Sequence, residues 1–150
     1  MTSAGIFARR FDSLDSVVQI GVASGRVINV SFPDEIPEDA DSDHELLDAV
    51  AEYLAGNPST VENADIGLTV PTEHRAVLEA LDSVSSGTTV TVSRLARVAG
   101  LDPSDDEALG TVRDALRANP VPLFLPDHRV RDGQGATPPR IAAALRRLEQ

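Results

Sequence analysis

Residues 119–130 read NPVPLFLPDHRV and form the most distinctive stretch of this 150-residue chain. The apolar run from Val121 to Leu125 predicts a buried segment. A proline-bounded turn follows it and carries three polar residues, Asp127, His128 and Arg129. This stretch is the specific signal in the sequence, and the rest of the chain is interpreted outward from it.

Apolar residues at helical spacing predict four helices in this half of the chain. Ser104 and Glu107 form a capping box at the start of the third helix, which Asn119 and Pro120 end. The second and third helices are short and are joined by a turn that contains Gly100, as in a helix-turn-helix. The four helices are expected near residues 72–85, 92–99, 104–118 and 141–148.

The first seventy residues carry a different pattern. Two β-branched runs in residues 17–32 flank Ser24 and Gly25 and predict a β-hairpin. Residues 33–43 are acidic and aperiodic and predict a solvated loop, and Ser42 with Glu45 forms a capping box for an amphipathic helix that ends near Gly56. A short strand is expected over residues 66–70.

These elements predict an α+β fold in two parts. Residues 1–70 form a small α+β domain built on the hairpin and a helix. Residues 71–150 form a mostly helical domain with a winged-helix-like helix-turn-helix.

Composition excludes several kinds of site. The chain has no cysteine, which rules out disulfides, thiolate nucleophiles and cysteine-bound zinc or iron–sulfur centres. Histidines and carboxylates show no metal-ligand spacing, and His44 and His74 are expected to be solvated near helix starts. We predict no metal and no cofactor. The lack of an apolar run long enough for a signal peptide or a membrane span predicts a cytoplasmic protein with no membrane partner.

Charge is distributed unevenly along the chain. All 13 basic residues are arginines, and 24 acidic residues give a net charge of −11. Residues 1–70 carry a net charge of −10, whereas the remainder carries −1. An anionic partner would therefore meet the second half of the chain. The abundance of acids without lysine resembles proteins of high-salt cytoplasms and predicts a halophilic source.

The stretch NPVPLFLPDHRV resembles the active-site motif of the alkylguanine-DNA alkyltransferases, the methylated-DNA–protein-cysteine methyltransferases. That motif is approximately NP-x-P followed by three aliphatic residues and PCHRV, and this chain departs from it only at Phe124 and at the acceptor cysteine. TTVTVSRLARVAG from Thr88 and TVRDALRANP from Thr111 resemble the family's helix-turn-helix, and the final Leu-Glu resembles its C-terminal end.

The resemblance implies an altered acceptor site. In the family a thiolate takes the alkyl group from guanine, and the next residue, a histidine, accepts the thiol proton through a water. Asp127 and His128 occupy these positions. A carboxylate near its reference pKa is ionised at neutral pH but is a weak nucleophile. A gapless match places Ala143 where the family has the glutamate that orients the histidine, and the loop GQGATPP is shorter than the family's loop. Three losses in one site predict that alkyl transfer has been abandoned.

DNA contacts are also inferred from the resemblance. Gly110 and Val92 occupy the positions of the arginine that fills the gap left by a flipped nucleotide and of the tyrosine that presses on its phosphate. Arg113 and Arg117 lie one and two turns beyond Gly110 and could contact phosphate, unless they pair with nearby acids. Arg129 is expected to hold the turn. The residues expected at the nucleic-acid site are Val92, Ser93, Gly110, Thr111, Arg113, Arg117, Asn119 and Arg129.

The resulting prediction is a non-catalytic, monomeric alkyltransferase-like protein. It would bind double-stranded DNA, with or without an alkylated base, and pass the lesion to another repair protein. Two alternatives remain: a transcriptional or architectural DNA-binding regulator that uses only the helix-turn-helix, and a methyltransferase homologue whose acceptor is Asp127. A third, less favoured alternative is a hydrolase of another class that uses Asp127 and His128 as an acid–base pair.

Overall fold

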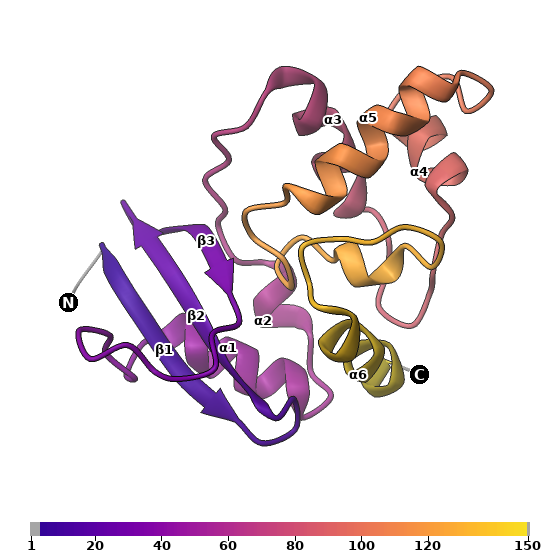
Figure 1. Cartoon of the computed structure of the whole chain (residues 1–150). Coiled ribbons are helices and arrows are strands. Elements are labelled where there is room, and N and C mark those ends of the chain that lie inside the picture. The colour runs from indigo at the N-terminus through magenta and orange to yellow at the C-terminus, as the bar shows by residue number, and fades with distance from the viewer. Residues whose placement is uncertain (1–3, 150) are drawn as a thin grey trace.

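The computed structural model describes residues 4–149 and has an α+β fold, as predicted. A three-stranded antiparallel sheet is followed by a set of helices, and Figure 1 shows the sheet at one end of the molecule with most helices at the other. No helix in this range is long and apolar enough to cross a membrane.

The sheet has the order β1-β2-β3, and its strands are Gly5–Phe11, Ser16–Ala23 and Arg26–Ser31. The predicted hairpin is β2 and β3, with positive φ angles at Ser24 and Gly25 in its turn. The sequence analysis missed β1, in which the polar pair Arg9 and Arg10 interrupts the apolar pattern.

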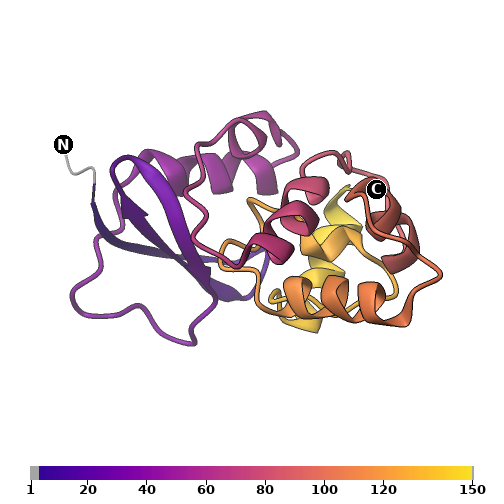
Figure 2. The same cartoon turned by 90° about the horizontal axis from the view of Figure 1, so that it is seen from above.

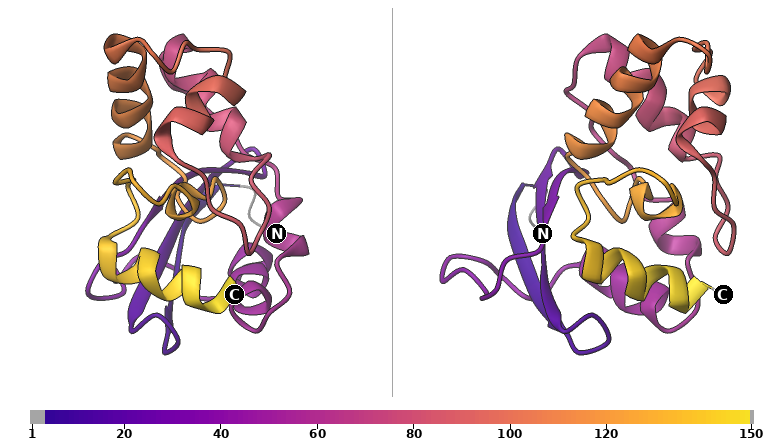
Figure 3. Two further views of the ribbon diagram at one scale, coloured as in Figure 1. Left: turned by 90° about the vertical axis from the view of Figure 1, so that its right-hand side faces the viewer. Right: turned by 45° about the vertical axis from the view of Figure 1, so that its right-hand side comes forward.

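Helix α1 (Glu45–Leu54) covers one face of the sheet, as Figures 1 and 3 show, and a single turn of helix α2 (Ser59–Glu62) follows it. Two details differ from the expectations. The side chain that caps α1 is that of His44, whose Nδ1 accepts the Leu46 amide, so His44 is not simply solvated. Residues 66–70 form no strand; only Ile66 bridges to Val27, because the chain leaves the sheet at Gly67.

The four helices predicted in the second half are present. They are α3 (Thr72–Leu81), α4 (Val92–Val98), α5 (Asp106–Arg117) and α6 (Pro139–Glu149). The residue that caps α5 is Asp105 and not Ser104, since the Asp105 carboxylate accepts the Glu107 amide. Figure 2 shows α3, α5 and α6 gathered around the segment that joins α5 to α6.

One continuous cluster of buried aliphatic side chains joins the sheet to the helices. The apolar run from Val121 to Leu125 lies inside this cluster, as predicted. The core therefore holds the following turn, Asp127–Arg129, rigidly between the two parts of the chain. The division of the chain at residue 70 into independent domains stays a prediction.

Candidate functional site: a buried carboxyl and histidine at the acceptor turn

Asn119 fixes the path of the chain into the turn. Its side-chain oxygen accepts the Val121 amide at 3.1 Å, and its Nδ2 donates to the Leu125 carbonyl at 3.0 Å and to Asp127 Oδ2 at 3.1 Å. Only an amide side chain offers both an acceptor and two donors for this pattern. Asn119 is buried, so it supports the turn from within and does not reach the surface to meet DNA.

Asp127 is buried, with a relative exposure of 1%. Its Oδ2 accepts a second hydrogen bond from the Ala136 amide at 2.9 Å, whereas Oδ1 has no hydrogen-bond partner among the described residues. Burial raises the pKa of the Asp127 carboxyl, although the hydroxyl of Thr137, the side-chain amide of Asn119 and the Ala136 amide act in the opposite direction. The expectation of a pKa near the reference value is therefore corrected.

The glycine-rich loop lies directly on Asp127. A Cβ atom placed on Gly135 would lie 2.3 Å from Asp127 Cγ, and one on Gly133 would lie 2.9 Å from a methyl group of Val92. Both positions therefore exclude any residue with a side chain. The loop is further anchored by Asp132, whose carboxylate accepts the Val92 amide at the start of α4 at 2.7 Å.

His128 is held by a carboxylate at the other end of the site. Its Nε2 lies 2.9 Å from Glu149 Oε2, and its Nδ1 is buried without a partner among residues 4–149. The prediction that the orienting carboxylate is lost is therefore wrong. It assumed a gapless match at Ala143, whereas the carboxylate that reaches His128 is that of Glu149, at the end of α6.

Arg129 and Tyr53 complete a buried cluster with Glu149. Arg129 donates from Nε and Nη2 to Glu149 and from Nη1 to the Val84 carbonyl at 2.6 Å. Tyr53 donates from its hydroxyl to Glu149, and this hydroxyl lies 3.3 Å from His128 Nε2. These hydrogen bonds tie the Arg129 side chain to the end of α6 and to the Val84 carbonyl.

The charges in this cluster stabilise one another. Burial of Glu149 opposes its ionisation, but hydrogen bonds from His128 and Arg129 outweigh that cost and lower its pKa to about 2. Burial, followed by the hydrogen bond to Glu149, raises the pKa of Tyr53 above its ordinary value. Tyr53 and Glu149 escaped the sequence analysis because their partners are distant along the chain; the final Leu-Glu was the available signal.

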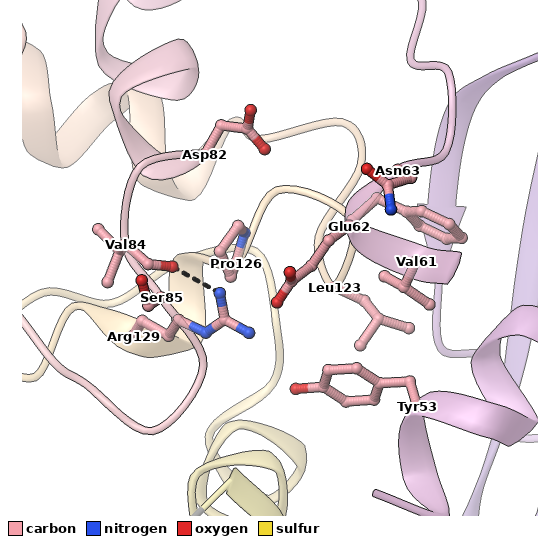
Figure 4. A pocket seen from close by; sticks show the side chains of 11 residues that line it. Tyr53, Val61, Glu62, Asn63, Asp82, Val84, Ser85, Leu123, Pro126 and Arg129 are labelled. Atoms are coloured by element: carbon pink, nitrogen blue, oxygen red, sulfur yellow. Dashed lines mark hydrogen bonds between the residues drawn. The ribbon is translucent and has the colours of Figure 1, made fainter. Parts of the chain in front are cut away.

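Two cavities flank the turn. The first, of about 220 Å³, lies between the two parts of the chain, where Tyr53 and Arg129 meet the acidic side chains of Glu62 and Asp82 (Figure 4). The second, of about 380 Å³, is lined by Asp127 and His128 together with the glycine-rich loop and Thr137. Thr137 Oγ1 is also buried without a partner in the part of the chain that the structure describes. The second cavity is thus lined by the three residues that carry these atoms.

The expected DNA-contacting residues separate into two groups. Val92, Asn119 and Arg129 are buried, and their expected role as contacts stays a prediction. Ser93, Arg113 and Arg117 are exposed, and Gly110 and Thr111 are partly so. Among residues 4–149, neither Arg113 nor Arg117 forms a salt bridge, although Arg113 reaches the Asp132 carbonyl at 3.4 Å.

Comparison with known proteins identifies the family. Residues 72–149 match the model of the 6-O-methylguanine DNA methyltransferase, DNA binding domain. This match spans more than half of the chain, so the chain belongs to the 6-O-methylguanine DNA methyltransferase family. No curated protein matches it.

Solved structures share the fold over nearly the whole chain. O6-methylguanine methyltransferase of Mycobacterium tuberculosis is similar with a TM-score of 0.70 and 18% identity, covering 97% of this chain and 93% of that one. The structure of the M. tuberculosis protein in complex with DNA gives a TM-score of 0.72 at 19% identity, with coverages of 96% and 92%. The methyltransferase of Pyrococcus kodakaraensis gives 0.58 at 22% identity, with coverages of 97% and 99%.

Proposed function

We propose that this chain binds double-stranded DNA, including DNA that carries an O6-alkylated guanine, and acts in DNA repair. The observation that carries the proposal is the family match, which covers α3 to α6 and is to the family's DNA-binding domain. The fold shared with the M. tuberculosis protein that was solved in complex with DNA supports it.

Charge supports α5 as the contacting element. The first part of the chain carries almost the whole net negative charge and would repel a phosphate backbone. Arg113 and Arg117 project from the exposed side of α5 without an acidic partner among the described residues. Two exposed arginines on successive turns of one helix can contact neighbouring phosphates.

The chain does not store an alkyl group as the cysteine-bearing members of its family do. It has no thiol, and Asp127 stands at the acceptor position. A thioether is permanent under physiological conditions, whereas an alkyl ester of a carboxyl group hydrolyses. We therefore propose a protein that does not end as a stoichiometric, permanently alkylated acceptor after its encounter with alkylated DNA.

Fluorescence anisotropy with labelled duplexes tests the proposal. One duplex contains a single O6-methylguanine and a matched duplex contains guanine, and both are titrated at low salt and in molar KCl. We expect saturable binding to both duplexes, tighter binding to the methylated one, and weaker binding as salt rises. Absence of binding to either duplex at low salt would overturn the proposal. Binding to one unmodified sequence alone would instead identify a regulator.

A further inference from the structure

We infer that Asp127 and His128 form a hydrolytic dealkylation site, in which the buried carboxyl accepts the alkyl group as an ester and the histidine directs water to remove it. The inference rests on the proposed function for its substrate, an O-alkylated guanine. The inferred reaction regenerates the protein after each alkyl transfer, whereas a cysteine acceptor is consumed. Three features carry it: the two inequivalent oxygens of Asp127, the unpartnered histidine nitrogen, and the cavity that both residues line.

The two oxygens of Asp127 have different environments. Oδ2 is fixed by two donors, Asn119 Nδ2 at 3.1 Å and the Ala136 amide at 2.9 Å. Oδ1 is buried, has no partner among residues 4–149, and belongs to a residue that lines the 380 Å³ cavity. A carboxyl that serves only to hold the loop would need no free buried oxygen, since an unmade hydrogen bond costs stability. Oδ1, which no N–H donor fixes, is therefore the oxygen that can react.

The two N–H groups that donate to Oδ2 are placed where ester hydrolysis requires donors. Once Oδ1 carries an alkyl group, Oδ2 becomes the carbonyl oxygen of the ester. Attack by water at Cγ turns this oxygen into an oxyanion, and two fixed N–H donors already point at it. A side-chain amide and a backbone amide form the same kind of oxyanion hole in acyl-transfer enzymes.

His128 has the arrangement of an oriented general base. Glu149 holds Nε2 at 2.9 Å and thereby fixes the ring, and Nδ1 is buried without a partner in the described chain. With the proton on Nε2, the neutral ring presents the Nδ1 lone pair as an acceptor. A nucleophile, an oriented histidine and an acid that orients it make up the general pattern of covalent catalysis.

The first step transfers the alkyl group. Asp127 Oδ1 attacks the alkyl carbon, and the bond between that carbon and O6 of guanine breaks. N1 of the base takes the carboxyl proton, so that the attacking group is the carboxylate, and the electron pair of the broken bond stays on O6, which becomes the C6 carbonyl oxygen of guanine. Burial, which raises the pKa of Asp127, favours the protonated carboxyl that this exchange consumes. The products are guanine and the Asp127 alkyl ester.

The second step restores the protein. Water adds to Cγ of the ester, and its proton passes to His128 Nδ1. The tetrahedral intermediate then expels the alcohol, which carries the original Oδ1 oxygen and takes the proton back from His128. The net reaction is O6-alkylguanine plus water giving guanine plus an alcohol, so no other reactant is required.

The loop controls access to this site. Oδ1 is buried, and Gly135 lies against Cβ, Cγ and Oδ2 of the Asp127 side chain. The segment from Gly133 to Gly135 must therefore lift before an alkyl group reaches the carboxyl.

The test uses the full chain at substoichiometric concentration with two probes, a duplex that contains one O6-methylguanine and the free nucleoside O6-methyldeoxyguanosine. Guanine formation is followed by mass spectrometry of nucleosides. We expect more than one equivalent of product per chain with at least one probe. A single turnover in water enriched in heavy oxygen should place one heavy oxygen on Asp127 and none in the first methanol released. Heavy oxygen in the methanol alone would show direct attack by water and would overturn the covalent route.

Variants separate the two steps. Asp127→Asn should abolish conversion. His128→Gln should form no more than one equivalent of guanine, accumulate a methyl ester on Asp127, and slow its hydrolysis roughly 100-fold. Asp12→Asn, in the exposed β1–β2 turn, is the matched control and should behave as the unsubstituted chain.

The remaining outcomes distinguish this inference from the proposed function. Tight binding of the methylated duplex without guanine formation, ester or label from either probe would overturn the inference and leave the proposed function standing. Conversion of the free nucleoside by a chain that binds no duplex would overturn the proposed function and leave the inference standing.

Discussion

Tyr53 on α1 donates a hydrogen bond to Glu149 at the end of α6, across a sequence separation of 96 residues. Figure 3 shows the two helices beside each other below the turn that carries Asp127 and His128. The hydroxyl of Tyr53 also lies 3.3 Å from His128 Nε2. Helix α1, in the first part of the chain, thus helps to hold Glu149 and His128 in place. The first three predictions concern this cluster.

Tyr53→Phe should lower the free energy of unfolding by about 1–2 kcal/mol, because it removes a buried hydrogen bond to a carboxylate and keeps the ring. Urea denaturation followed by circular dichroism measures the change. Thr60→Val is the matched control, since it removes an exposed hydroxyl that donates to Glu52. Equal losses in the two variants would show that burial of the Tyr53 hydrogen bond adds nothing.

Glu149 makes stability depend on acid pH. Its folded-state pKa of about 2 lies below the ordinary value of 4.5, so its contribution is complete above about pH 4.5 and is lost as pH falls towards 2. Glu149→Gln should cost roughly 3 kcal/mol at neutral pH, because Arg129 stays buried without its ion pair.

Glu149→Gln should also flatten the plot of unfolding free energy against pH between pH 4.5 and 2, which urea titrations at several pH values will show. Glu73→Gln, at an exposed position in the first turn of α3, is the control. An unchanged curve in Glu149→Gln would contradict the assigned pKa.

Asp127→Cys should convert the chain into a stoichiometric alkyl acceptor. If Ala143 stood in the orienting position, as the gapless match assumed, the new thiol would lack an oriented base and would take up little of the alkyl group. With Glu149 at 2.9 Å from His128, the new thiol gains an oriented base.

Because the chain has no other cysteine, intact-protein mass spectrometry after incubation with methylated duplex detects methyl uptake by the introduced thiol without interference from another thiol. Ser42→Cys, an exposed thiol far from the turn, should take up no methyl group. Adding Glu149→Gln to Asp127→Cys should slow uptake by at least about tenfold. An inert Asp127→Cys chain that still binds the duplex would show that the loop seals the site.

DNA affinity should depend on Arg113 and Arg117. Replacing both with alanine should weaken duplex binding and reduce the salt dependence, log K against log salt, by up to about two. Arg10→Ala with Arg26→Ala removes the same charge from the sheet and should leave the slope unchanged. If both double variants lose affinity equally, net charge and not α5 governs binding.

Two substitutions at Gly110 are expected to have favourable effects, one on the stability of the chain and the other on its affinity for DNA. It lies inside α5, and a Cβ atom added there would meet nothing within 4 Å. Gly110→Ala should therefore stabilise the chain by about 0.5–1 kcal/mol without changing affinity. Gly110→Arg should tighten duplex binding and raise the salt dependence by about one phosphate contact. An affinity for Gly110→Arg no higher than that of Gly110→Ala would place this turn of α5 away from the DNA.

Local sequence pattern predicted those helices and strands whose formation depends on residues close together in the chain. Helical periodicity and breakers located α1 and the four later helices, because amphipathic faces and Gly or Pro stops act over a few residues. The β2–β3 hairpin followed from its turn at Ser24 and Gly25 for the same reason. The motif NPVPLFLPDHRV was enough to indicate the family, which the match over residues 72–149 confirmed.

Only the tertiary structure decided what surrounds the turn. Spacing along the chain could not place Glu149 or Tyr53 against His128, because contacts between distant residues depend on how the helices pack and on the length of the loop between them. Nor could the residue type Asp127 reveal that burial raises its pKa and that only one of its oxygens is bound. Whether a carboxyl is an inert substitute or a reactive group depends on its solvation and its hydrogen-bond partners, and folding supplies both.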